Sequence, residues 1–141
     1  MDTTTETDKQ GLWKIRPGVL ADKAFVLSTW LRGLRYGNDW FEAIDADPYF
    51  RIYQTVIESI LSRPGTKVDV ACLKDDEDVI LGYSVYQPSY LHWIFVKKAW
   101  RGIKIGKALM PNDIVSVTHL TAIGRKLLLK SPTKITFNPF L

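Results

Sequence analysis

The chain has 141 residues, of which 46% are hydrophobic and 24% are charged. This composition is typical of a globular protein of one compact domain and excludes a chain that is disordered throughout. Because there is no run of 18 apolar residues and no apolar signal segment near Met1, we expect neither a membrane span nor secretion, and we predict a cytoplasmic protein.

Positive charge is concentrated in the last third of the chain. The net charge is +4, yet residues 91–141 alone carry nine basic side chains and one acidic side chain. This asymmetry indicates a polyanionic ligand near the C-terminal half, either a phosphate-rich cofactor or a nucleic acid.

The first part of the chain predicts a strand followed by two helices. Residues 1–10 are rich in Thr, Asp and Glu and predict a flexible tail, which leaves 11–141 as the single domain. A short strand is expected over 12–16. Apolar residues recur at helical spacing over 22–36, and again from Pro48 to Leu61.

Three strands are expected next, over 67–73, 79–87 and 90–96. The acidic connection after Leu73 and the Gln87-Pro88-Ser89 connection both predict turns, so the three strands should form an antiparallel meander. Cys72, the single cysteine, falls in an apolar strand, where a small buried side chain is favoured over a reactive thiol.

The final elements alternate between helix and strand. A helix is expected over 105–110, a strand over 115–120, a helix over 121–130 and a last strand over 134–137. The sequence therefore predicts a mixed α/β domain without internal repeats.

The connection from the third strand of the meander to the helix at 105–110 is basic and contains glycine. The first amides of a helix have no partner inside the helix, and the helix dipole adds partial positive charge there. Gly102 and Gly106 allow close approach of a ligand, and Arg101, Lys104 and Lys107 add full charges. This pattern indicates a phosphate site, and a solvated basic loop is the alternative.

The same residues resemble the cofactor loop of the GNAT superfamily of N-acetyltransferases, whose pattern is Gln/Arg-x-x-Gly-x-Gly/Ala. Arg101 and Gly106 match its first and last positions, while Lys104 stands where the first glycine of the family usually stands. The order of predicted elements also resembles the GNAT arrangement over nearly the whole chain. The resemblance implies a three-layer α+β fold with a mostly antiparallel sheet, in which the fourth and fifth strands are splayed to admit acetyl-coenzyme A.

The resemblance further implies which residues hold this cosubstrate, with no metal involved. The amides from about Ile103 to Lys107 would bind its pyrophosphate, and the edge of the fourth strand would pair with its pantetheine arm. The cofactor-binding residues expected on this basis are Ile94, Phe95, Val96, Arg101, Gly102, Ile103, Lys104, Ile105, Gly106 and Lys107.

Direct acetyl transfer to a primary amine needs a base and a group that protonates the departing thiolate. The family often places a carboxylate on the fourth strand, but here His92 is the only titratable group of that stretch and is our candidate base. A structural histidine is the alternative. His119 could face the cleft from the fifth strand, although we favour a solvated or buried structural role for it. The last helix lacks the tyrosine that usually serves as general acid.

The acceptor side is expected between the first two helices, where acidic and aromatic residues alternate. Such a rim would attract a cationic amine, either a small molecule or a protein lysine or N-terminus, although a solvated acidic loop is the alternative. The residues concerned are Asp39, Trp40, Phe41, Glu42, Asp45, Asp47 and Tyr49.

Two other functions stay open, as does a homodimer. The chain could bind coenzyme A without catalysis, as Lys104 and the missing tyrosine suggest. The basic residues of the last third could instead bind nucleic acid, with Trp93 or Trp100 stacking on bases, although we favour this less.

Overall fold

The computed structural model describes residues 9–129 and 134–141, and it describes only the backbone of Trp40, Ile123, Leu128 and Leu129. The predicted flexible tail lies outside the described residues except for Lys9 and Gln10. Lys9 contacts the body of the protein, since its Nζ donates to the carbonyl oxygen of Ala99 at 2.6 Å and lies 5.2 Å from the centre of the Trp100 ring.

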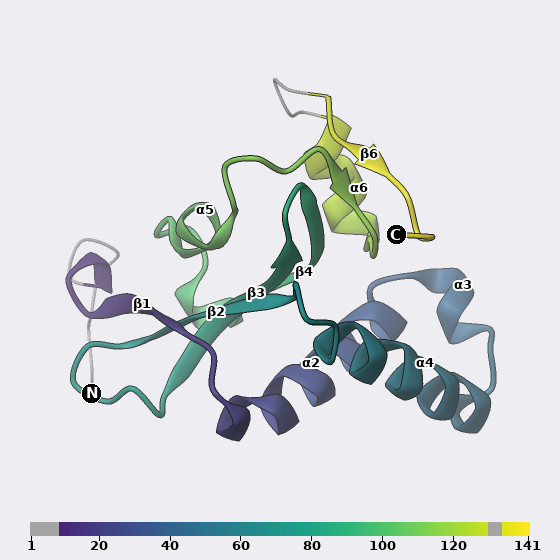
Figure 1. Ribbon diagram of the computed structural model, residues 1–141, viewed down its shortest axis with the longest axis horizontal. Coiled ribbons are helices and arrows are strands. Elements are labelled where there is room, and N and C mark those ends of the chain that lie inside the picture. The colour runs from purple at the N-terminus through teal and green to yellow at the C-terminus, as the bar shows by residue number, and fades with distance from the viewer. Residues whose placement is uncertain (1–8, 130–133) are drawn as a thin grey trace.

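Six strands form one sheet in the order β1-β2-β3-β4-β5-β6 (Figure 1). The first four are antiparallel, and β5 and β6 run parallel to β4, so the predicted antiparallel meander is confirmed. The strand bounds are Trp13–Pro17 (β1), Lys67–Leu73 (β2), Ile80–Gln87 (β3), Tyr90–Val96 (β4), Ser116–Val117 (β5) and Thr136–Phe137 (β6).

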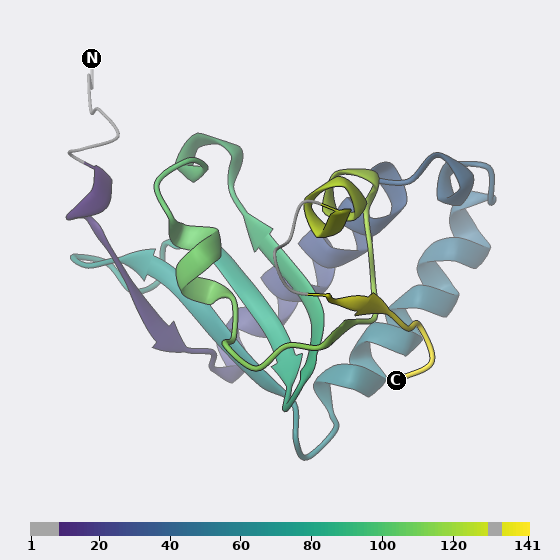
Figure 2. The same cartoon turned by 90° about the horizontal axis from the view of Figure 1, so that it is seen from above.

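Helices cover both faces of the sheet, which gives three layers (Figure 2). Alternate side chains of β2 contact opposite layers: Val70 and Cys72 pack toward α2 and α4, and Ala71 packs toward α5. The helix bounds are Lys23–Tyr36 (α2), Asp39–Glu42 (α3), Ala46–Leu61 (α4), Ile105–Leu109 (α5) and Ala122–Leu129 (α6), with 3-10 turns at Leu20–Asp22 (η1) and Lys98–Trp100 (η2). No helix in the described part of the chain is both long and apolar enough to cross a membrane.

The strands β4 and β5 separate soon after they meet. Their register contains only the pairs Tyr90↔Ser116 and Leu91↔Val117, followed by one bond from the Thr118 amide to the Leu91 carbonyl oxygen at 3.0 Å. A β-bulge at His92 shifts the register against β3 at this point. Beyond Leu91, β4 therefore pairs with β3 alone among the described residues, and the predicted splay of the fourth and fifth strands is confirmed.

Three predicted elements differ from the structure. The last strand, expected over 134–137, contains only Thr136 and Phe137. The strand expected over 115–120 contains only Ser116 and Val117, because the side chains of Thr118 and His119 bond to each other and to β4 instead of alternating between faces. The region between the first two predicted helices, where no element was expected, contains α3, which has only four residues and gives too short a pattern to be seen in the sequence.

Candidate active site

The loop between β4 and α5 turns through two left-handed residues. Gly102 has φ 84°, and Lys104 has φ 72° and ψ 12°. Glycine adopts this region at no steric cost, whereas a lysine pays for the contact between its Cβ and the backbone. Lys104 thus occupies a backbone conformation that favours the glycine it replaces in the family pattern.

Six consecutive amides of this loop have no protein partner. Among the described residues, none of the N–H groups of residues 102–107 donates a hydrogen bond, and the first bonded amide of α5 is that of Ala108, which reaches the Lys104 carbonyl oxygen at 3.0 Å. Arg101, Lys104 and Lys107 are exposed beside them. Unbonded amides with added positive charge form an environment that suits an anion.

Space at Gly106 is consistent with a ligand lying against the loop. A Cβ atom built there would meet only Cγ2 of Val96, at 3.9 Å. The residues present therefore fit a pyrophosphate at this position, because the loop amides are unbonded and the space beside Gly106 is open.

The edge of β4 beside the loop exposes the backbone of alternate residues. The Lys97 amide bonds the Leu81 carbonyl oxygen at 2.8 Å, so the backbone groups of Phe95 also face β3, while those of Ile94 and Val96 face the open edge. The carbonyl oxygen of Val96 accepts a hydrogen bond from Nε of Arg101 at 2.9 Å. Of the three β4 residues predicted to pair with a ligand, Ile94 and Val96 present their amides to it.

His92 is fully buried and both of its ring nitrogens are hydrogen-bonded. Nδ1 lies 2.7 Å from Oγ1 of Thr118, and Nε2 lies 2.8 Å from Oε1 of Gln87. Burial lowers the pKa of His92 to about 4, assisted by the positive charge of Arg63. The imidazole is therefore neutral at pH 7. Direct contact between His92 and an acceptor would require one of these two bonds to break.

His119 lies at the point where β4 and β5 separate. Its Nδ1 is 2.9 Å from Oγ1 of Thr118, and its ring meets Trp30 edge-on at 5.2 Å between ring centres. Burial lowers its pKa to about 4 as well, with contributions from His92 and Arg63. Unlike His92, it keeps part of its surface exposed.

Three partners of these histidines could not be identified from the sequence. Gln87 on β3, Thr118 after β5 and Arg63 after α4 join the cluster only through the tertiary fold, with Nη1 of Arg63 donating to Oε1 of Gln87 at 3.2 Å. Only the adjacency of Thr118 and His119 in the sequence offered a signal.

On the acceptor side, the acidic and the aromatic residues separate. Asp39, Glu42, Asp45 and Asp47 are exposed, whereas Phe41 and Tyr49 are buried in the core. The hydroxyl of Tyr49 donates to the Leu31 carbonyl oxygen at 2.7 Å. The expected rim is therefore acidic at its surface, and these two aromatic side chains belong to the core beneath it.

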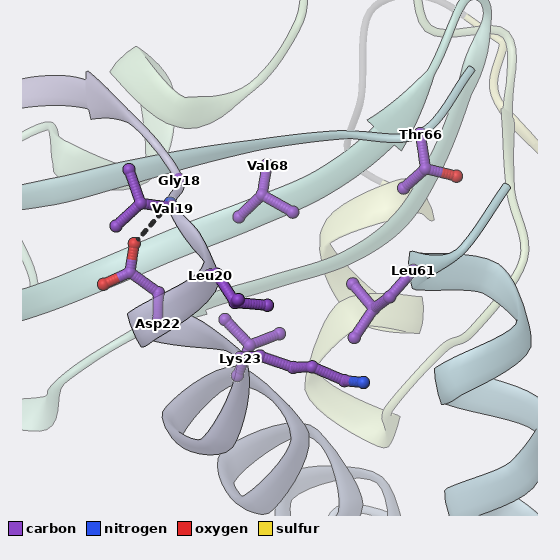
Figure 3. Close-up of a pocket in the computed structure, with 9 residues that line it drawn as sticks. Gly18, Val19, Leu20, Asp22, Lys23, Leu61, Thr66 and Val68 are labelled. Atoms are coloured by element: carbon purple, nitrogen blue, oxygen red, sulfur yellow. Dashed lines mark hydrogen bonds between the residues drawn. The ribbon is translucent and has the colours of Figure 1, made fainter. Parts of the chain in front are cut away.

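Another hollow lies away from the loop, between η1 and the end of α4 (Figure 3). Val19, Leu20, Lys23 and Leu61 contribute to its lining, and none of the predicted site residues does. Within the described residues, no group of three or more His, Cys, Asp or Glu side chains could hold a metal ion.

Comparison with protein-family profiles gives no match, and comparison with curated protein sequences gives no significant match. Several solved structures are similar to this chain over most of the length of both. A candidate acetyltransferase from Bacillus subtilis superposes with a TM-score of 0.62 at 12% identity, covering 86% of this chain and 92% of that one. A candidate acetyltransferase from Clostridium acetobutylicum, solved with acetyl-CoA, gives a TM-score of 0.58 at 12% identity, with coverages of 87% and 90%.

A third similar structure is a candidate acetyl transferase from Pyrococcus furiosus. Its TM-score is 0.52 at 19% identity, and the match covers 89% of this chain and 81% of that chain. The chain has the GNAT fold. At these identities the likeness establishes the architecture, and in the GNAT fold the separation of β4 and β5 places the unbonded loop amides and the histidine cluster along one open edge.

Proposed function

We propose that this protein is an N-acetyltransferase that transfers the acetyl group of acetyl-coenzyme A directly to a primary amine. The observation that supports the proposal most strongly is the run of six unbonded amides at residues 102–107, beside a β4 edge that has lost its strand neighbour. On a GNAT fold, these two features coincide with the place where a nucleotide-linked thioester would lie.

In this proposal, the loop and β4 divide the binding between them. The amides of residues 102–107 would receive the pyrophosphate, with Arg101, Lys104 and Lys107 neutralising its charge. Ile94 and Val96 would pair with the pantetheine arm, which requires Arg101 to release the Val96 carbonyl oxygen. Phe95 lies between these two residues in β4, but it would make no backbone bond to the arm, because its own backbone groups face β3.

The acceptor is proposed to be cationic before it reacts. Asp39, Glu42, Asp45 and Asp47 are exposed on the segment from α3 to the first turn of α4 and would raise the local concentration of an amine. His92 stays our candidate for the group that accepts the proton of the amine, within the cluster it forms with Thr118 and His119. A cytoplasmic location and a homodimer also stay predictions.

Calorimetry with acetyl-coenzyme A tests the site. Gly106→Trp fills the open space in front of the loop, so we expect at least a tenfold loss of affinity with an unchanged free energy of unfolding. Ser59→Trp, at an exposed position of α4, is the matched control and should bind as tightly as the wild type. Equal affinity of Gly106→Trp and Ser59→Trp would refute the site.

A protein that binds coenzyme A without catalysis is the second candidate. The observation in its favour is that His92 has no free ring nitrogen. Release of free thiol from acetyl-coenzyme A in the presence of a panel of primary amines distinguishes the two, because tight binding without any release would support the non-catalytic function.

A further inference from the structure

Five side chains form one hydrogen-bonded series from the segment that follows α4 to the segment that follows β5. Arg63 contacts Gln87, Gln87 contacts His92, His92 contacts Thr118, and Thr118 contacts His119. The heavy-atom distances along it are 3.2, 2.8, 2.7 and 2.9 Å. The series begins at a permanent positive charge and ends where β4 and β5 separate.

The donors and acceptors of this series can be assigned from the Arg63 end. A guanidinium only donates, so the atom of Gln87 that it contacts must be the oxygen, and that oxygen can only accept. Nε2 of His92 must therefore carry a hydrogen. Because His92 is neutral, its Nδ1 is bare and accepts from the hydroxyl of Thr118.

The assignment then passes to His119. The single hydroxyl hydrogen of Thr118 is used on His92, so the Thr118 oxygen accepts from Nδ1–H of His119. A neutral His119 with its hydrogen on Nδ1 has a bare Nε2. This nitrogen makes no hydrogen bond to the described part of the chain, and the ring is partly exposed.

His119 is placed to exchange a proton with a ligand bound between β4 and β5. The bond from the Thr118 amide to Leu91 is the last one between β4 and β5, and His119 is the next residue along the chain. Trp30 contacts the His119 ring edge-on and stacks on Trp93 at 5.9 Å between ring centres, which fixes the imidazole against α2 and β4.

We propose that Nε2 of His119 accepts the proton of the acceptor amine, and that Thr118 and His92 are positioning residues that hold His119 in the Nδ1–H tautomer. This inference rests on the proposed function. His119 thereby replaces His92 as the base that contacts the amine. His92 instead accepts the hydrogen bond of the Thr118 hydroxyl and so sets the direction in which that hydroxyl points.

The chemistry balances within the proposed reaction. The amine, which arrives as a cation, first loses one proton to water. Its neutral nitrogen then forms a bond to the thioester carbon, the C–S bond breaks, and the nitrogen loses its second proton to Nε2 of His119. That proton then passes to the departing thiolate or to water. A weak base suffices, because an amine nitrogen that has attacked a carbonyl is far more acidic than a free ammonium ion.

Nitrogen-15 NMR of the ring nitrogens tests the positioning part without any substrate. The chain has two histidines, so at neutral pH we expect one neutral imidazole in each tautomer, His92 as Nε2–H and His119 as Nδ1–H. Thr118→Val should return His119 to the Nε2–H form that imidazole prefers in water, whereas Thr55→Val, at an exposed position of α4, should change neither ring. Two Nε2–H imidazoles in the wild type would overturn the proposal.

Thiol release from acetyl-coenzyme A, with the amine panel as acceptors, tests the catalytic part. We expect His119→Gln to lower kcat about 100-fold or more while the dissociation constant of acetyl-coenzyme A stays within twofold. Thr118→Val should lower kcat about tenfold, and Thr118→Ser, which keeps the hydroxyl, should restore it.

The outcomes separate this inference from the proposed function. Full kcat in His119→Gln, with a wild type that turns over, would overturn the role of His119 alone. A wild type that binds acetyl-coenzyme A and releases no thiol would overturn both, and a wild type that does not bind it would refute the site itself.

Discussion

At the scale of single residues, burial keeps the two histidines uncharged. The pKa values of His92 and His119 are both lowered to about 4 from the ordinary value near 6.5, chiefly because of burial. The charge on Arg63 adds to the shift of the His92 pKa, and His92 and then Arg63 add to that of the His119 pKa. The native state therefore binds fewer protons than the unfolded state between pH 4 and 6.5.

The sign of the resulting pH dependence follows from linkage. Stability from these groups is fully present above pH 6.5 and is lost as the pH falls toward 4, at up to about 1.4 kcal/mol per pH unit for each histidine. We expect His92→Gln to reduce that slope in urea unfolding measured at several pH values. Thr55→Val should leave the slope unchanged, and an unchanged slope in His92→Gln would show that His92 is not held neutral.

Lys104 is predicted to strain the loop. Its φ of 72° costs a side chain with a Cβ about 1 kcal/mol or more, so Lys104→Gly should raise the free energy of unfolding by about 1 kcal/mol. Lys107→Gly, inside α5, is the matched control and should lower it by about the same amount. Urea unfolding measures both, and a loss of stability in Lys104→Gly would contradict the assigned backbone conformation.

Part of the site could be predicted at this scale and part could not. Arg101, Gly102 and Gly106 are recognisable because a glycine-containing basic turn before a helix has a local pattern. Gln87 and Arg63 lie in different elements from Thr118, and only tertiary structure brings them to His92. The burial that leaves His92 without a free nitrogen likewise depends on packing that no local pattern encodes.

At the scale of elements, the position of β4 against β3 depends on Gly82. A Cβ at Gly82 would lie 2.5 Å from the carbonyl oxygen of Phe95, and a backbone atom cannot move aside cheaply. Gly82→Ala should therefore lower the free energy of unfolding by about 1–3 kcal/mol, as overpacking does elsewhere.

A second glycine provides the control for this prediction. In Gly65→Ala, the nearest atom to the new Cβ is Nε2 of Gln87 at 3.5 Å, an ordinary contact. We expect denaturant unfolding to give a change below about 0.5 kcal/mol for Gly65→Ala. Equal stabilities of the two variants would mean that β3 and β4 do not approach as closely as described.

Element prediction succeeded where a strand or helix carries its own pattern. The strands at 67–73 and 90–96 have the bounds expected, since each is an apolar run limited by a turn. β5 is shorter than expected because Thr118 and His119 use their side chains across the strands. α4 begins at Ala46, two residues before Pro48, because proline is tolerated throughout the first turn of a helix.

At the scale of the whole molecule, the fold brings two separate features to one edge of the sheet. The unbonded amides follow β4 along the chain, and the histidine series approaches from β3 and β5. Both lie beside the edge of β4 that is left open where β5 separates from it after Leu91. The acetyltransferase proposal depends on whether a ligand occupies that opening.

Backbone amide NMR during a titration with acetyl-coenzyme A is the most direct test. We predict that the largest chemical-shift changes will fall on the amides of residues 102–107, with Ile94 and Val96 next, because these N–H groups gain partners on binding. Saturable shifts confined to other surfaces, or no shifts at millimolar ligand, would contradict the assignment of this loop as the pyrophosphate site.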